Sequence, residues 1–131
     1  MSTRSTITLS TPEGYQSIYC HNDGYLSHNG AILKEFYDTE DKVKELIKLG
    51  SLSSLEKNLA PEEDQEHNFH NRVDDVTVAY HRDRGEDLAI ALYDTLEEVY
   101  ADKEDYNYVF VDGQWWLLKE GLYTDVTLVK F

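Results

Sequence analysis

The dipeptide Asp112-Gly113 is the feature that most constrains the fold of this chain, because it separates two strand-like segments at 106–111 and 114–118. Asp-Gly favours the two-residue turn whose backbone twist matches that of paired strands. A hairpin closed at this turn places Tyr108 opposite Leu117 and gathers aromatic and aliphatic side chains on one face. The segment therefore predicts an antiparallel hairpin.

The spacing of apolar residues predicts the remaining elements. Strands are expected at 6–10, 15–20, 76–80, 88–93, 106–111, 114–118 and 125–131, and helices at 31–37, 40–49 and 96–101, with one more helical turn within 51–59. The continuous apolar run at 88–93 is typical of a central strand covered on both faces. Because the strands come in hairpins, we predict an α+β fold, a mainly antiparallel sheet built from hairpins with two or three short helices on one face.

The length of 131 residues predicts a single domain, 1–131, with a mobile acidic loop near 60–74. The single cysteine, Cys20, excludes a disulfide within the chain and favours a reducing compartment. The sequence contains no signal-peptide pattern and no apolar stretch of about 20 residues. We therefore expect a cytoplasmic protein.

Acidic residues dominate the charge, with 26 Asp and Glu against 12 Lys and Arg and a net charge of −14. This balance argues against direct nucleic-acid binding, which needs a basic face, and against binding to anionic membranes. Residues 61–131 hold eighteen acidic and six basic side chains, whereas 1–60 hold eight and six. The acidity serves either solubility or the binding of a basic partner. The expected partner-binding carboxylates are Glu97, Glu98, Asp102, Glu104 and Asp105.

Two charged turns, 19–25 and 80–87, each follow an expected strand and supply ligand-binding candidates. These candidates are Tyr19, His21, Asp23, His81, Arg82 and Arg84. An arginine fork can grip a phosphate or carboxylate with two hydrogen bonds. If the preceding strands are parallel neighbours, the two turns emerge together and His21, Asp23, His81 and Arg82 form one cluster. The alternatives are a buried cysteine followed by a tight turn, and a surface ion-pair network.

The sequence predicts no metal, no cofactor and no catalytic residue. Cys20, His21 and Asp23, or His67 and His70, contain metal-ligating groups, but no four-ligand set has the spacing of a zinc site. Cys20 and His21 are adjacent in a strand, so their side chains point to opposite faces and do not form a nucleophile pair. Phosphate-loop, nucleophile-elbow and metalloprotease motifs are absent from the sequence.

Four segments, in this order along the chain, resemble a family of small proteins encoded by bacteriophages and prophages. They are MSTRSTI at 1–7, IYCHNDGY at 18–25, GSLSSL at 50–55 and VAYHRDRGE at 78–86. The resemblance implies a phage origin and the cytoplasm of an infected bacterium, and it supplies no activity or catalytic residue. Relatives often carry Trp where this chain has Asn22, so the chain departs from the family there.

Two classes of function remain. The first is an acidic, non-enzymatic interaction protein that inhibits a basic host protein, a nucleic-acid-binding enzyme or defence complex, by mimicking nucleic acid. The second is a small enzyme or binding module for a nucleotide or phosphate compound that uses the two charged turns. Carboxylates along one exposed ridge favour the first class, and a cleft that joins the two turns favours the second. We expect the first.

Overall fold

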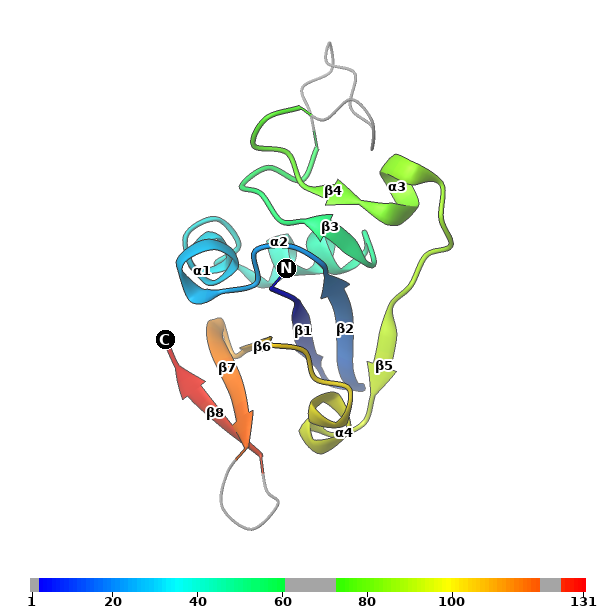
Figure 1. The fold of residues 1–131 in the computed structure, drawn as a ribbon. Helices are drawn as coiled ribbons and strands as arrows, with labels where there is room; N and C mark the ends of the chain where they lie inside the picture. Colours follow the sequence, from blue (N-terminus) through cyan, green and yellow to red (C-terminus); the bar gives the residue numbers. More distant parts are fainter. Residues whose placement is uncertain (1–2, 61–72, 121–125) are drawn as a thin grey trace.

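The protein is built around one mixed sheet of eight strands (Figure 1). A computed structural model describes residues 3–60, 73–120 and 126–131. The strands are β1 (Ser5–Thr11), β2 (Gly14–Cys20), β3 (Leu52–Ser54), β4 (Val78–Ala79), β5 (Ala91–Tyr93), β6 (Tyr106–Val111), β7 (Gln114–Glu120) and β8 (Val126–Lys130). The helices are the π-helix η1 (Leu26–Gly30) and α1 (Ala31–Phe36), α2 (Glu40–Ile47), α3 (Tyr80–Arg84) and α4 (Leu96–Ala101). The strand order is β4-β3-β2-β1-β6-β7-β8, with β5 also paired to β2.

Two hairpins form the centre of the sheet, and both were predicted from the sequence. β1 and β2 pair antiparallel over their whole length. β6 and β7 pair in the expected register, with Tyr108 opposite Leu117. Asp112 and Gly113, in the turn between them, have φ angles of 51° and 78°. Both angles lie in the left-handed region that a tight Asp-Gly hairpin turn requires.

Parallel pairing makes the sheet mixed, so the expectation of a sheet assembled from hairpins holds only in part. β6 pairs parallel with β1, and β3 pairs parallel with β2 where Cys20 lies opposite Leu52. The pairing of β1 with β6 brings together residues 101 positions apart, among them Thr6 and Asn107. A parallel pair needs a long connection, and therefore no turn signal marks it in the sequence.

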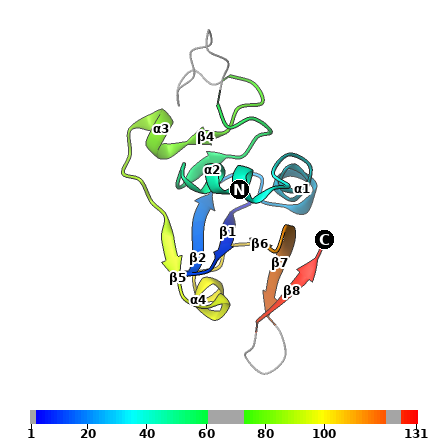
Figure 2. The ribbon, with the colours of Figure 1, turned by 180° about the vertical axis from the view of Figure 1, so that it is seen from behind.

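Helices cover both faces of the sheet, so the expectation of two or three helices on one face holds for α1 and α2 but not for α4 (Figures 1 and 2). On one face Tyr108 of β6 packs in a cluster with Leu33 of α1 and side chains of α2. On the other face Val109 packs in a second cluster with Val99 of α4. Neighbouring residues of a strand point to opposite faces, and the sheet therefore separates these two clusters.

Threonine side chains cap the N-termini of α2 and α4. The hydroxyl of Thr39 accepts a hydrogen bond from the backbone N–H of Lys42, and that of Thr95 accepts one from Glu98. These side chains satisfy amide groups that the first helical turn leaves unpaired. The π-helix η1 was not predicted, because π-helices are rare and have no strong sequence pattern.

Two expectations for the middle of the chain were wrong. Residues 51–59, where one helical turn was expected, contain strand β3 instead. The strand expected at 76–80 is reduced to β4, because Tyr80 begins helix α3 where a turn was expected. Gly85 ends α3 with a φ of 79°, the left-handed conformation usual after a helix.

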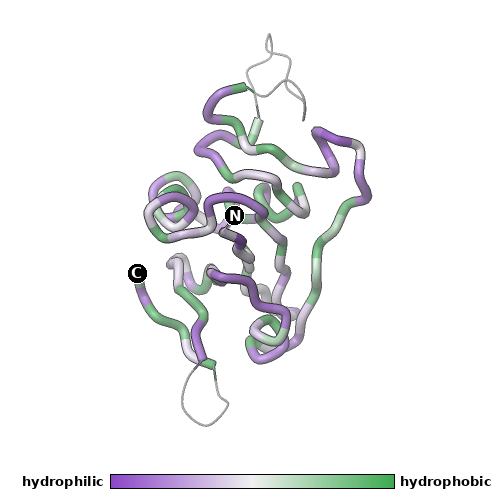
Figure 3. The backbone as a smooth tube through the Cα atoms, viewed as in Figure 1, coloured by the Kyte–Doolittle hydropathy of each residue, from purple (hydrophilic) through white to green (hydrophobic). Residues whose placement is uncertain are grey.

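The apolar segment at 88–93 is not a central strand. Within it only Ala91–Tyr93 form a strand, which pairs with β2 along one edge. Leu88 and Leu92 are 49% and 74% exposed. In Figure 3 this segment turns from hydrophilic to hydrophobic as it runs from α3 into β5 along the outside of the molecule. Ile90 packs against the core, but the described residues do not cover Leu88 and Leu92.

The acidic loop expected near 60–74 falls mostly on residues 61–72, which lie outside the described residues. His67 and His70 belong to the same part of the chain. In the described helices no segment is long and apolar enough to cross a membrane.

Candidate functional site

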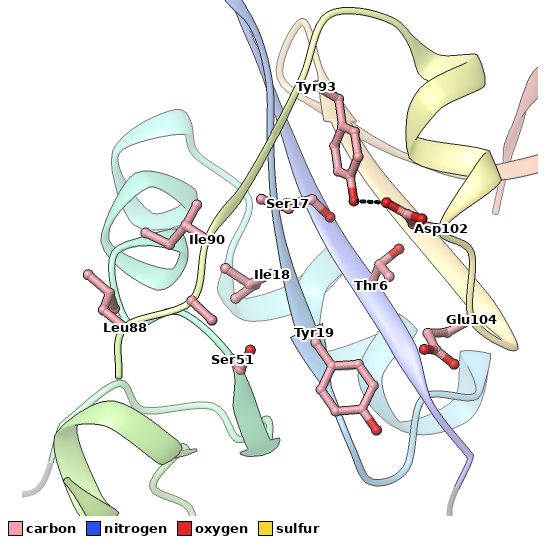
Figure 4. Close-up of a pocket in the computed structure, with 12 residues that line it drawn as sticks. Thr6, Ser17, Ile18, Tyr19, Ser51, Leu88, Ile90, Tyr93, Asp102 and Glu104 are labelled. Carbon is pink, nitrogen blue, oxygen red and sulfur yellow. Dashed lines mark hydrogen bonds between the residues drawn. The ribbon is translucent and has the colours of Figure 1, made fainter. Parts of the chain in front are cut away.

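A hollow opens beside the sheet because the outer edge of β2 is shared between two short strands. β3 pairs with this edge at Cys20, and β5 pairs with it from Tyr15 to Ser17. Ile18 and Tyr19 lie between the two pairings. The extended segment 88–91 passes alongside them and borders an open space of about 370 Å³ (Figure 4). This volume is at the small end of the range for ligand pockets.

Two glycines let the outer segment approach the sheet. A Cβ atom on Gly50 would lie 2.8 Å from the side chain of Leu88, and one on Gly14 would lie 2.5 Å from the carbonyl oxygen of Tyr93. Both glycines also have positive φ angles, which disfavour other residues. The hollow is therefore bounded by a segment that the fold holds at both ends.

Buried hydroxyl groups form the floor of the hollow. Thr6 and Ser17, from β1 and β2, line it and are 9% and 5% exposed. The Thr6 hydroxyl donates to Asn107 Oδ1 over 2.8 Å, and the Thr8 hydroxyl donates to Ser17 Oγ over 2.9 Å. Because these bonds lie within the protein, they hold the floor in one arrangement.

Two of the predicted carboxylates, Asp102 and Glu104, stand on one wall. The hydroxyl of Tyr93 donates to Asp102 Oδ2 over 2.6 Å. Burial, reinforced by this hydrogen bond and by the charge of Asp102, raises the pKa of Tyr93 to about 12. Asn107 bonds to both the N–H and the carbonyl oxygen of Glu104, which fixes the turn that carries this carboxylate.

Tyr19 is the only one of the six ligand-binding candidates among the residues that line this hollow. Its hydroxyl oxygen lies 2.7 Å from Nδ1 of His21, so a hydrogen bond joins these two candidates. Burial raises the pKa of Tyr19; the charge of Glu104 acts in the same direction and that of Arg4 opposes it.

The opposite wall is apolar and comes from the outer segment. Leu88, Ala89 and Ile90 are among the lining residues. In Figure 4 the side chains of Leu88 and Ile90 point away from the carboxylates, and Ile90 packs against the core cluster that contains Ile18. All the residues that line the hollow are described, and none of them is Lys, Arg or His. The hollow thus combines carboxylates, hydroxyls and aliphatic groups with no positive charge.

The other three predicted partner-binding residues extend from the hollow along the surface. Glu97, Glu98 and Asp105 are exposed. Glu98 accepts a hydrogen bond from the N–H of Asp94, and Asp105 accepts one from the N–H of Arg4. Among the described side chains, Lys and Arg form no ion pair with any of the five predicted carboxylates. The five residues lie between α4 and the start of β6, and we call them the acidic ridge.

The two charged turns leave the sheet in opposite directions. β3 is parallel to β2 and antiparallel to β4, so β2 and β4 run oppositely with β3 between them. The strands that precede the two turns are therefore neither neighbours nor parallel. Parallel neighbouring strands were the condition for one cluster of His21, Asp23, His81 and Arg82. Asp23 instead accepts a hydrogen bond from Tyr25 within its own turn.

Contacts within the second turn account for its candidates. His81 Nδ1 lies 2.7 Å from the carbonyl oxygen of Glu86, and Arg84 pairs with Glu86 at 3.5 Å. The guanidinium of Arg82 is bonded to Asp83 and to two backbone carbonyl groups. Arg82 therefore fits the alternative of an ion-pair network better than that of a ligand-binding residue.

Cys20 lies in the core, on the face opposite Tyr19 and His21, as the alternation of strand residues predicts. Burial raises the pKa of its thiol from 9.0 to about 11, against hydrogen bonds that lower it. The folded state thus favours the protonated thiol. Its contribution to stability is complete below pH 9 and is lost as the pH rises to 11.

We predict that the wild-type protein loses about 2 kcal/mol of stability relative to Cys20→Ala between pH 9 and pH 11. Urea unfolding of both proteins at several pH values measures the difference, because the alanine variant lacks this titration. Below pH 9 the difference between the two proteins should stay constant. A constant difference up to pH 11 would contradict the assignment of Cys20 as an inert buried thiol.

Sequence reasoning missed most of the lining of the hollow. Thr6 and Ser17 carry a weak signal, since they are polar positions in alternating strands. Tyr93 and Leu88 belong to the run that was predicted to be a central strand. Because such a strand is covered on both faces, neither residue was expected to line a surface hollow. In the part of the chain that the structure describes, no three His, Cys, Asp or Glu side chains are grouped to hold a metal ion.

Comparison of the chain with protein-family models, with curated proteins and with solved structures yields no match. The arrangement of side chains in this structure therefore carries the functional argument.

Proposed function

We propose that this chain is an acidic interaction protein that binds a basic partner protein through the acidic ridge and the exposed segment beside it. The observation that carries the proposal is the exposure of Leu88 and Leu92 in the apolar run at 88–92, which borders an acidic hollow. An exposed apolar patch with a polar border is typical of a protein-binding surface.

The apolar run favours a partner that covers it. Its leucines resemble core residues in type, and yet they face solvent. The outer edge of β5 also has no strand partner within the described sheet. Such an edge can accept a strand from another chain, so backbone hydrogen bonding and apolar contact are both available there.

The charges favour a basic partner over a second copy of this chain. Asp87 and Asp94 stand on either side of the apolar run, and the acidic ridge begins directly after it. Antiparallel pairing of two copies along this run would bring the two aspartates of one copy near those of the other. Like charges placed opposite one another destabilise a strand pair.

In the phage setting that the sequence resemblance implies, the partner is a nucleic-acid-binding host enzyme or defence complex. Rows of carboxylates can occupy a basic groove that normally receives phosphates, and charge complementarity speeds such an encounter. The alternative, a nucleotide- or phosphate-binding module, has less support. The two carboxylates of the hollow repel an anionic ligand, and no lining residue is a Lys, Arg or His that could bind one.

The proposal is tested by capture of partners from bacterial lysate, with the double variant Leu88→Ser/Leu92→Ser beside the wild type. We expect a basic protein to be captured at low salt, to be released at high salt, and to bind the variant about thirtyfold more weakly. Each lost leucine contact is worth roughly 1 kcal/mol or slightly more.

The matched control is Val129→Ser, which removes an exposed apolar side chain from β8 at the far edge of the sheet. This variant should bind like the wild type. Equal binding by the double-leucine variant, or a captured protein that is acidic and insensitive to salt, would contradict the proposed function.

A further inference from the structure

We infer that the hollow between β2 and the segment 88–91 receives the guanidinium group of an arginine side chain presented by the basic partner. The inference deepens the proposed function and rests on it. It assigns to one cavity the recognition of one chemical group, and it can be tested without the partner.

The lining of the hollow offers acceptors to a cation. Asp102 gives one carboxylate oxygen to the hydroxyl of Tyr93 and keeps Oδ1 for another donor. Glu104 stands on the same wall, and its side chain is half-buried. Two carboxylates with no positive charge among the lining residues set up a site that attracts a cation and repels an anion.

The donor pattern favours guanidinium over a metal ion. Two lining carboxylates are fewer ligands than a metal site usually needs, and the described residues hold no group of three. A guanidinium carries five N–H donors in a planar fork, is weakly hydrated and stacks on aromatic faces. The rings of Tyr19 and Tyr93 line the hollow and can provide such faces.

The apolar wall fits the rest of an arginine side chain. Ala89 and Ala91 of the outer segment and the ring of Tyr19 are among the residues that line the hollow. Arginine buries its methylene groups along apolar surface while its head group keeps polar contacts. The hydrogen-bonded floor of Thr6 and Ser17 does not have to rearrange for entry, which favours binding.

The test uses N-acetyl-arginine amide as the probe and N-acetyl-citrulline amide as its uncharged isostere. We expect saturable amide chemical-shift changes at Ser17, Tyr19 and 88–91, with a Kd of about 1 mM. The citrulline compound should give at least tenfold weaker binding. The double variant Asp102→Asn/Glu104→Gln should lose binding to the same extent, because it keeps the shape of the site and an acceptor for Tyr93.

The control variant is Glu45→Gln, which removes one negative charge from the exposed surface of α2, away from the acidic ridge and outside the lining of the hollow. It should bind the probe like the wild type. Equal binding of arginine and citrulline compounds, or no saturable shift at the hollow, would overturn the inference. If that happens while a basic partner is still captured, the proposed function stands. If the probe binds and no basic partner is captured, the proposed function fails.

Discussion

Reversal of the five ridge carboxylates to lysine, at Glu97, Glu98, Asp102, Glu104 and Asp105, is expected to abolish binding of the basic partner. Attraction between opposite charges raises association rates from about 10⁵–10⁶ to 10⁸–10⁹ M⁻¹ s⁻¹ at low salt, and the reversal turns this attraction into repulsion. Binding measured by surface plasmon resonance should weaken by at least 100-fold, mainly through the association rate.

The reversal needs a control for net charge. Each reversed residue changes the charge by two, so five reversals take the net charge from −14 to −4. The matched variant reverses five exposed acidic residues on α1, α2 and the turn between them, which lie away from the ridge: Glu35, Asp38, Glu40, Asp41 and Glu45. This control should keep most of the binding. Equal loss in both variants would show that only net charge matters.

The fold of the ridge variant also has to be verified. Glu98 and Asp105 accept backbone hydrogen bonds, and Glu98 lies in the first turn of α4, where a positive charge is unfavourable. A variant with the five residues changed to Gln or Asn keeps side-chain oxygen acceptors. It should bind weakly and unfold in urea near the wild-type midpoint.

Arg82→Ala is expected to destabilise the protein by about 3 kcal/mol, the largest effect on stability that we predict for one substitution. Arg82 Nε lies 2.9 Å from Asp83 Oδ1, and Nη2 lies 3.0 Å from Oδ2. The Asp83 side chain is only 3% exposed. Removal of the arginine takes a positive charge and two hydrogen bonds away from this buried carboxylate, which is among the costlier changes in a folded protein.

The arginine also joins separate parts of the chain. Its two terminal nitrogens donate to the carbonyl oxygens of Leu59 and Thr77, and Asp83 accepts from the N–H of Ala79 over 2.8 Å. These contacts tie α3 to the segments before β4. Removing them therefore loosens the upper part of the sheet in Figure 1 as well as the ion pair.

Arg84→Ala is the matched control, because Arg84 and its partner Glu86 are each about half exposed. An exposed pair contributes up to about 1 kcal/mol. The double variant Arg82→Ala/Asp83→Asn should recover part of the loss, since the buried charge is then absent. Equal unfolding free energies for Arg82→Ala and Arg84→Ala would show that Arg82 has no structural role and would leave it as a ligand-binding candidate.

Local chemistry explains the parts of the fold that were predicted correctly. Asp112-Gly113 has the backbone preference of a hairpin turn, and the apolar spacing within 40–49 and 96–101 is that of a helix. Each of these signals acts within a few residues. The parallel pairing of β1 with β6 joins residues far apart in sequence, and neither segment contains a local signal that predicts its pairing partner.

The run at 88–93 was misread for a different physical reason. Apolar composition predicts that side chains are buried, but it does not say whether they are buried within the same chain or against another protein. The acidic ridge was predicted from charge density alone. The hollow beside it was not, because it results from the division of one edge of β2 between β3 and β5, which is a property of the assembled sheet.

The parallel contact between β1 and β6 also bears on how the chain is made. The ribosome releases β1 and β2 about a hundred residues before the strand that completes the middle of the sheet. The early hairpin must therefore persist with one long edge open, and closing a loop of that length slows folding. Thr6 and Thr8 make one face of β1 more polar, which reduces the apolar surface that the early hairpin exposes. Synthesis rate and chaperone access thus become determinants of yield for this protein.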